Sequence, residues 1–301
     1  MRNELTKTSN IWIIGCGNTG KHVSRTLIDN GFRVNATSHS EQSIKKLESL
    51  SINAVYADLD DATSLNNLEI DGADIFYFAP PLPQGNEDQR MSAFLGSLKP
   101  HTPPRRIVYI STTGVYGNHD GAWITEKTPT NPENGRSKRR LDAENKIIQF
   151  CQSNNSEYMI LRVAGIYDLN KLPFKRIENG LKVLDPDIAP ASNRIHTHDL
   201  ANICIAAMQS EHTNLTLNVA DGNPSSISDY FVKTARLFNL KEPEIISWQQ
   251  AQTELSPEMM SYLQESKKID ISALITQLKI KLQYPNLSAG LQACKEEYES
   301  Q

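Results

Sequence analysis

The chain has 301 residues, of which 39% are hydrophobic and 22% charged, and its formal net charge is −4. This composition is typical of a globular protein with a large core, and it excludes a disordered or fibrous chain. The slight excess of acidic residues argues against a nucleic-acid partner, because phosphate binding requires a basic face.

The four cysteines lie far apart, without the short spacings of a zinc site or a disulfide framework. We expect buried thiols and no metal. Residues 1–10 are polar, and no apolar run approaches the length of a membrane span. These features predict a reduced, cytoplasmic protein with no membrane partner. The one basic cluster, residues 136–140, is followed by Asp142 and Glu144 and is expected to form a solvated helix face.

The first half of the chain alternates short apolar runs with amphipathic stretches. Apolar runs that alternate with helices indicate a parallel sheet covered on both faces, which predicts an α/β fold of the doubly wound Rossmann type. The predicted strands cover residues 11–14, 32–37, 54–57, 73–79, 106–111 and 158–163, and the predicted helices cover residues 21–30, 41–50, 89–98 and 138–151.

The alternation ends near Gly165, and the rest of the chain is more polar. We predict a Rossmann domain over residues 1–165 and a smaller C-terminal substrate lobe, mainly residues 166–301, over the carboxyl edge of the sheet. The strand and helix near residues 193–220 are expected to return to the first domain. The elements predicted here are strands over 194–196 and 217–220 and helices over 199–208, 227–238 and 248–264.

A glycine motif follows the first strand and opens the first helix. Its spacing, GxGxxG, is typical of dinucleotide binding: the first glycine allows a tight turn, the second lets the backbone approach a pyrophosphate, and the third allows the helix to pack closely on the strand. The helix N-terminus faces the negative charge. A plain glycine turn is the alternative, and the strand–loop–helix context favours the dinucleotide. The predicted contacts are Gly15, Cys16, Gly17, Asn18, Thr19 and Gly20.

The residues after the second strand bear on the choice between NAD and NADP. A carboxylate there would bind the ribose 2′-hydroxyl of NAD, whereas this chain has Ser38 and His39. We therefore predict NADP ahead of NAD, although the loop has no arginine. Asp58 and Leu59 are expected to contact the adenine edge, with a helix N-cap as an equal alternative for Asp58. The remaining predicted cofactor contacts are Ala79, Pro80 and Ser111.

Further motifs follow in chain order: YISTTGVYG at 109–117, LRVAGIY at 161–167, NRIHTHDLA at 193–201 and SKKI at 266–269. With the glycine motif and Asp58-Leu59, they resemble the NAD-dependent epimerase/dehydratase family of extended short-chain dehydrogenases/reductases, and more narrowly its atypical bacterial YeeZ-like subgroup. The resemblance covers nearly the whole chain. It implies an NAD(P)-binding protein that acts on a nucleotide-linked sugar or a similar hydroxylated small molecule, as a monomer or homodimer.

The family's chemistry implies a hydroxyl residue after the fifth strand and a tyrosine four residues before a lysine, which exchange protons with a substrate hydroxyl. Thr112 matches the hydroxyl position, with backbone capping as an equal alternative. If Lys138 is the family lysine, the tyrosine position holds Asn134. If Glu144 fixes the register instead, the pair becomes Arg136 and Arg140. Neither register contains a Tyr-Lys pair.

Two other tyrosines, Tyr116 and Tyr167, lie in motifs that flank the family's active site, and Tyr167 is the one we retain as a possible acid. An amphipathic wall residue is the better interpretation of both. By the resemblance, Arg194 lies on the substrate side and Asp199 caps a helix. Lys267 and Lys268 are expected to be a solvated pair.

Two functions therefore remain. The first is an oxidoreductase or epimerase-like enzyme in which Thr112 orients the substrate. The second is a cofactor-binding sensor or scaffold without turnover, which the absent Tyr-Lys pair favours. A polar, closed pocket beside the nicotinamide would favour the enzyme, and an occluded one the sensor. A structural protein with an empty glycine loop is a third, weaker alternative.

Overall fold

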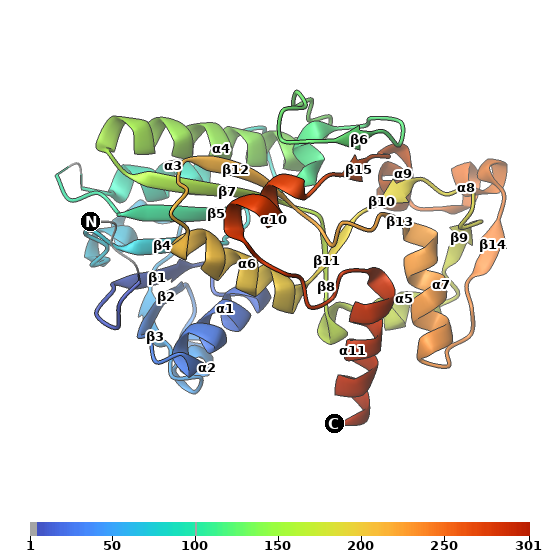
Figure 1. Ribbon diagram of the computed structural model, residues 1–301, viewed down its shortest axis with the longest axis horizontal. Coiled ribbons are helices and arrows are strands. Elements are labelled where there is room, and N and C mark those ends of the chain that lie inside the picture. Colours follow the sequence, from blue (N-terminus) through green and yellow to red (C-terminus); the bar gives the residue numbers. More distant parts are fainter. Residues whose placement is uncertain (1–4, 100) are drawn as a thin grey trace.

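A computed structural model describes residues 5–99 and 101–301 (Figure 1). Residues 1–4 of the predicted polar N-terminal segment lie outside the described residues. Within the described chain, the largest sheet has seven parallel strands in the order β12-β7-β5-β4-β1-β2-β3, which confirms the predicted doubly wound α/β fold. The strands are β1 (Ile11–Ile14), β2 (Val34–Ser38), β3 (Asn53–Tyr56), β4 (Asp74–Tyr77), β5 (Arg106–Thr112), β7 (Glu157–Val163) and β12 (Leu215–Val219).

Helices cover both faces of this sheet, which explains why its central strand β1 is apolar at every position. Ile11 and Ile13 of β1 lie in one apolar layer, whereas Trp12 and Ile14 lie in the other. The first layer includes α1 (Asn18–Asp29) and α6 (Thr197–Gln209), and the second includes α3 (Gln89–Ser97) and α4 (Gly135–Asn154) (Figure 1). Helix α2 (Glu41–Glu48) packs beside β3.

The strand order reverses at β1, whose neighbours are β2 on one side and β4 on the other. From β2 the chain continues outward to β3, and from β4 it continues outward on the other side to β5. Because these connections diverge, a crevice opens at the carboxyl ends of β1 and β4. The glycine loop follows β1 directly. The fold therefore places the predicted cofactor motif where doubly wound sheets bind ligands.

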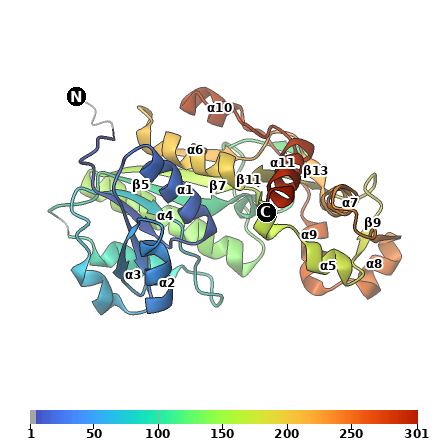
Figure 2. The ribbon, with the colours of Figure 1, turned by 90° about the horizontal axis from the view of Figure 1, so that it is seen from below.

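A group of elements that includes α5 (Phe174–Glu178), α7 (Ile227–Leu237), α8 (Trp248–Glu254) and α9 (Pro257–Gln264), here called the second lobe, extends from the carboxyl edge of the sheet (Figures 1 and 2). The first strand after β7 is β8 (Gly165–Tyr167), which pairs in parallel with β11 (Arg194–His196) rather than with the large sheet. The other small pairs are β9 (Lys182–Leu184) with β14 (Glu244–Ile246), β10 (Ala191–Ser192) with β13 (Ser225–Ser226), and β6 (Trp123–Ile124) with β15 (Lys268–Ile269). Besides these four helices and α6, the helices beyond β8 are α10 (Ser272–Leu278) and α11 (Leu287–Glu299).

Several predicted boundaries differ from the structure for local reasons. Helix α4 begins at Gly135, three residues early, because the Asn134 side chain accepts a hydrogen bond from Ser137 N at 2.9 Å. The helix predicted over 248–264 is wrong. It is two helices, since Ser256 caps α9 and Pro257 occupies its first turn, where proline ends the preceding helix. The last two helices, α10 and α11, were not predicted.

Helix α6 does not begin at Asp199, so the predicted cap is wrong. Its N-cap is His196, whose Nδ1 accepts a hydrogen bond from His198 N at 3.3 Å. The Asp199 carboxylate instead accepts hydrogen bonds from Gln283 N and Tyr284 N, which hold the segment leading into α11. His196 is buried, and burial lowers the pKa of its imidazole to about 4.

This shift predicts a pH-dependent stability. Because unfolded His196 gains a proton near pH 6.5 and the folded residue only near pH 4, the free energy of unfolding should fall by about 3 kcal/mol as the pH falls through that window. The variant His196→Asn keeps a capping side chain that does not titrate. Urea unfolding at several pH values should show a smaller loss for the variant. Parallel curves for the two proteins would contradict the assignment.

Candidate functional site

The glycine loop has the geometry that its sequence predicts. Gly15 has φ +86°, and a Cβ on it would lie 2.5 Å from the backbone nitrogen of Ala79. A Cβ on Gly20 would lie 3.2 Å from the Ile13 side chain, so this glycine brings α1 against β1. A Cβ on Gly17 would meet no atom within 4 Å, which leaves its backbone open to a ligand. The loop therefore fits a pyrophosphate at the N-terminus of α1.

The same loop is tied to the second lobe through a buried carboxylate. The Asn18 side-chain amide donates a hydrogen bond to Asp168, and Thr197 Oγ1 donates to the same oxygen at 2.7 Å. Asp168 follows β8 and Thr197 begins α6, so three elements meet at the start of α1. No local pattern predicts this contact, because Asn18 and Asp168 are 150 residues apart in the chain.

The predicted adenine side lies at the ends of β2 and β3. Asp58 is not a helix N-cap: it accepts a hydrogen bond from Asp60 N at 2.9 Å, and Asp61 caps the following 3-10 helix, η1 (Ala62–Asn67). Arg90 of α3 donates to both carboxylate oxygens of Asp60 and to Pro80 O at 3.1 Å. This arginine lowers the pKa of Asp60 and connects the end of β3 to the end of β4.

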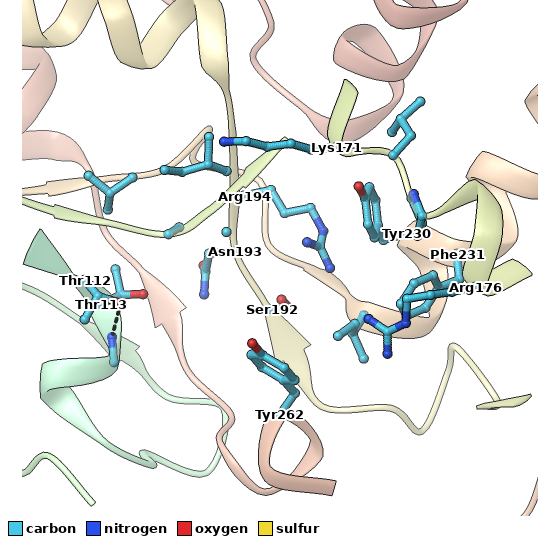
Figure 3. Close-up of a pocket in the computed structure, with 18 of the residues that line it drawn as sticks. Thr112, Thr113, Lys171, Arg176, Ser192, Asn193, Arg194, Tyr230, Phe231 and Tyr262 are labelled. Atoms are coloured by element: carbon cyan, nitrogen blue, oxygen red, sulfur yellow. Dashed lines mark hydrogen bonds between the residues drawn. The ribbon is translucent and has the colours of Figure 1, made fainter. Parts of the chain in front are cut away.

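A cavity of 1250 Å³ lies between the carboxyl end of β5 and the second lobe (Figure 3). Thr112 and Thr113 line it on the sheet side, while Tyr230 and Phe231 of α7 line it on the lobe side. Tyr262 of α9 enters from a third direction. The cavity is large enough for a small molecule, and both charged and apolar side chains line it.

Two registers on α4 were considered for the family's tyrosine and lysine, and only one of them faces this cavity. Arg136 and Arg140 line the cavity, whereas Lys138 does not, and Asn134 serves as the N-cap. Arg140 donates hydrogen bonds to Ile110 O at 3.0 Å and to the Tyr109 hydroxyl at 3.1 Å.

The prediction of a solvated basic face is confirmed for Arg136 and Lys138, which are exposed, and is wrong for Arg139 and Arg140. Arg139 is buried, and it donates to Gly85 O at 2.6 Å. Lys267 is likewise buried rather than solvated, because its amine binds Gly117 O and pairs with Glu265 at 3.0 Å. In both segments, hydrogen bonds or ion pairs within the fold engage charged side chains that the local pattern assigns to solvent.

A buried ion pair behind the cavity wall holds Glu144 in place, and with it the face of α4 that carries Arg136 and Arg140. Glu144 is 1% exposed and binds Arg162 of β7 through both carboxylate oxygens. The Ser111 hydroxyl donates to the same carboxylate. Ser111, a predicted cofactor contact, thus has its side chain engaged inside the protein.

Thr112 ends β5 and is half-buried at the cavity wall. Its Oγ1 accepts a hydrogen bond from Gly114 N at 3.1 Å, which is the capping role considered from the sequence. A threonine hydroxyl can accept that hydrogen bond and still donate one to a ligand. The two interpretations of Thr112 are therefore compatible.

The two tyrosines considered as acids do not line the cavity. The Tyr116 hydroxyl donates to Asn218 Oδ1 at 2.7 Å in the core. Tyr167 is 1% exposed and faces Gly290 of α11 so closely that a Cβ there would overlap its hydroxyl. Burial raises the pKa of Tyr167 far above the ordinary value. These surroundings argue against Tyr167 as a catalytic acid.

Arg194 is the predicted substrate-side residue, and it lines the cavity from β11. Its side chain is buried, and its guanidinium lies 3.9 Å from the centre of the Tyr230 ring. Its Nε and Nη2 atoms have no hydrogen-bond partner among the described residues. Figure 3 shows this guanidinium beside Tyr230, opposite Tyr262. Unpartnered buried donors of a cation favour an anionic ligand.

Solved structures similar to this protein cover nearly the whole chain. A conserved protein of unknown function from Silicibacter pomeroyi is 27% identical with a TM-score of 0.83, over 96% of this chain and 99% of that one. UDP-glucose 4-epimerase from Thermotoga maritima, solved with UDP-glucose, is 17% identical with a TM-score of 0.76, over 97% and 99%. The chain therefore has the fold of this epimerase, as the resemblance implied.

UDP-arabinose 4-epimerase 1 of Arabidopsis thaliana is 27% identical over an alignment of 173 residues that covers 50% of this chain and 41% of the plant protein. The chain thus matches less than half the length of that relative. No helix among the described residues is long and apolar enough to cross a membrane. A sequence model described as NAD(P)H-binding matches residues 15–211, about two thirds of the chain, so this protein belongs to the NAD(P)H-binding family.

Proposed function

We propose that this protein is an NADP-dependent oxidoreductase or epimerase-like enzyme for a nucleotide-linked sugar or a related hydroxylated metabolite. The observation that carries the proposal is Arg194, a buried cation with unpartnered donors in a cavity next to the end of β5. A diphosphate would provide the acceptors that these donors lack. The names of the similar epimerases support the same substrate class.

The cofactor would lie across the carboxyl ends of β1, β2 and β4. Gly15 to Gly20 would hold its pyrophosphate, Ser38 and His39 its 2′-phosphate, and Asp58 and Leu59 its adenine edge. Bound NADP supplies hydride transfer at the nicotinamide. Ala79, Pro80 and Ser111 would lie along the nicotinamide half through their backbone. We keep residues 1–165 and 166–301 as the proposed cofactor and substrate parts, in a cytoplasmic monomer or homodimer.

The Thr112 hydroxyl would donate a hydrogen bond to a substrate oxygen while it accepts one from Gly114 N. Arg136 and Arg140 replace the family's tyrosine and lysine in the register that Glu144 sets. An arginine stays charged and does not cycle a proton at neutral pH. In this site the two residues would therefore bind and orient anions and hydroxyls, and we assign Tyr167 no part in the reaction.

The test is binding followed by turnover. Calorimetric titration should show that NADPH binds more tightly than NADH, because Ser38 and His39 present donors and no carboxylate to the ribose. The variant His39→Asp should shift the ratio of the two affinities toward NADH by about tenfold, since a carboxylate repels the 2′-phosphate and accepts from the 2′-hydroxyl. A wild-type protein that binds neither dinucleotide contradicts the proposal.

The alternative is a cofactor-binding sensor or scaffold without turnover, and the observation that favours it is the pair Arg136 and Arg140 at the reactive positions. The two functions differ in one assay. Incubation of the holoprotein with nucleotide-linked sugars should give reduced cofactor or an epimerised product, and Thr112→Ala should lower that rate. Cofactor binding with no conversion of any nucleotide-linked sugar would favour the sensor.

A further inference from the structure

The cavity carries much more positive than negative charge. Seven cationic and two anionic side chains line it, and within the described residues Lys267 is the only one of these cations in an ion pair. Unneutralised like charges repel each other and cost stability, so such an excess indicates an anionic ligand. The cations are Arg136, Arg140, Lys171, Lys175, Arg176, Arg194 and Lys267, and the carboxylates are Glu178 and Glu265.

One pair of these cations lies on the lobe side. Arg194 lies over the ring of Tyr230 at 3.9 Å, and Arg176 lies over the ring of Phe231 at 5.4 Å. The two rings are neighbours on α7, so both guanidiniums are held against the same helix, as Figure 3 shows. Stacking orients each planar group without using its hydrogen-bond donors. This pair suits the diphosphate of the proposed substrate.

A separate pair lies at the opposite wall, at the end of β5. The first turn of α4 packs on the Thr112–Gly114 turn so closely that a Cβ on Gly114 would lie 2.6 Å from Ser137 Oγ. Arg140 is held there by Ile110 O and Tyr109. Arg136, one turn earlier on the same face, makes no hydrogen bond or ion pair with any described residue and lies 6.0 Å from the Tyr262 ring centre.

The two pairs have different positions, and one diphosphate accounts for only the lobe-side pair. We propose that the substrate carries a second anionic group, a carboxylate on its sugar, which Arg136 binds at the Thr112 end of the cavity. A guanidinium matches a carboxylate in two parallel hydrogen bonds, and the adjoining Arg140 charge favours the same group. This inference rests on the proposed function and restricts its substrate class to nucleotide-linked acidic sugars.

The experiment compares three ligands on the NADP-loaded protein: UDP-glucuronate, UDP-glucose and UDP. The first two differ at one carbon, which carries a carboxylate in one and a hydroxymethyl group in the other. Calorimetry should show that UDP-glucuronate binds at least about tenfold more tightly than UDP-glucose, since a hydrogen bond to a charged group contributes more than a neutral one. The preference should weaken as the salt concentration rises.

Two variants separate the two anion sites. Arg136→Gln should bring the ratio of the two affinities close to one, whereas Arg176→Gln should weaken UDP-glucuronate, UDP-glucose and UDP by similar factors. Lys138→Gln is the matched control, because Lys138 lies on the same turn of α4 and is exposed like Arg136, but it does not line the cavity. It should change none of the three affinities.

The outcomes distinguish the inference from the function beneath it. Equal affinities of the wild-type protein for the two sugars, or a preference that survives Arg136→Gln, would overturn the carboxylate assignment and leave the nucleotide-sugar function in place. Failure of all three UDP ligands to bind would overturn both. The wild-type comparison alone is decisive if Arg136→Gln does not fold.

Discussion

Replacing Glu144 by alanine should lower the free energy of unfolding by about 3–5 kcal/mol, a large share of the stability of a protein of this kind. The change leaves the Arg162 guanidinium buried between β7 and α4 without its carboxylate. It also removes the acceptor of the Ser111 hydroxyl. Urea unfolding followed by circular dichroism measures the loss.

Two controls decide whether the loss comes from an unpaired buried charge. Asp29→Ala removes an exposed i,i+4 pair with Arg25, and it should cost less than about 1 kcal/mol. The double variant Glu144→Leu with Arg162→Met removes both charges, so it should recover much of what Glu144→Ala loses. If the single and double variants are equally unstable, the packing of α4 rather than the ion pair explains the effect.

The second large effect is expected at the glycine loop. Gly15→Ala places a side chain in a left-handed conformation, which costs about 1–3 kcal/mol, and drives its Cβ to 2.5 Å from Ala79 N. The end of β1 must shift away from β4, and the loop with it. We expect lower stability and an affinity for NADPH reduced by about 100-fold, the loss of one or two hydrogen bonds to charged groups.

Gly17→Ala is the matched variant, since its Cβ would meet no protein atom and its φ of −76° suits alanine. Its stability should stay within about 0.5 kcal/mol of the wild type, as for a surface substitution. NADPH binding should nevertheless fall, because the added methyl lies where the pyrophosphate approaches the backbone. Unchanged NADPH affinity in Gly17→Ala would exclude the loop as the phosphate site.

The glycine loop is the part of the site that could be predicted, because its residues adjoin one another in the chain. The glycine spacing, the apolar strand before it and the helix after it are all within ten residues of one another, so one local pattern specifies the whole loop. Arg194 was identified through its motif, but its burial against Tyr230 and its unpartnered donors depend on α7, which is more than thirty residues later. Asp168, Arg90 and Tyr262 were missed, because each reaches the site from a distant segment.

The sequence by itself determined the parallel sheet, its covered faces and the glycine loop, because side-chain periodicity and glycine conformation are local properties. It left two registers for α4 and two roles for Thr112. Only the tertiary structure decided that Arg136 and Arg140 face the cavity, that Lys138 does not, and that Tyr167 lies beneath α11. The reason is that a helix can present any face until its partners are known, and here the buried Glu144–Arg162 pair fixes the rotation of α4.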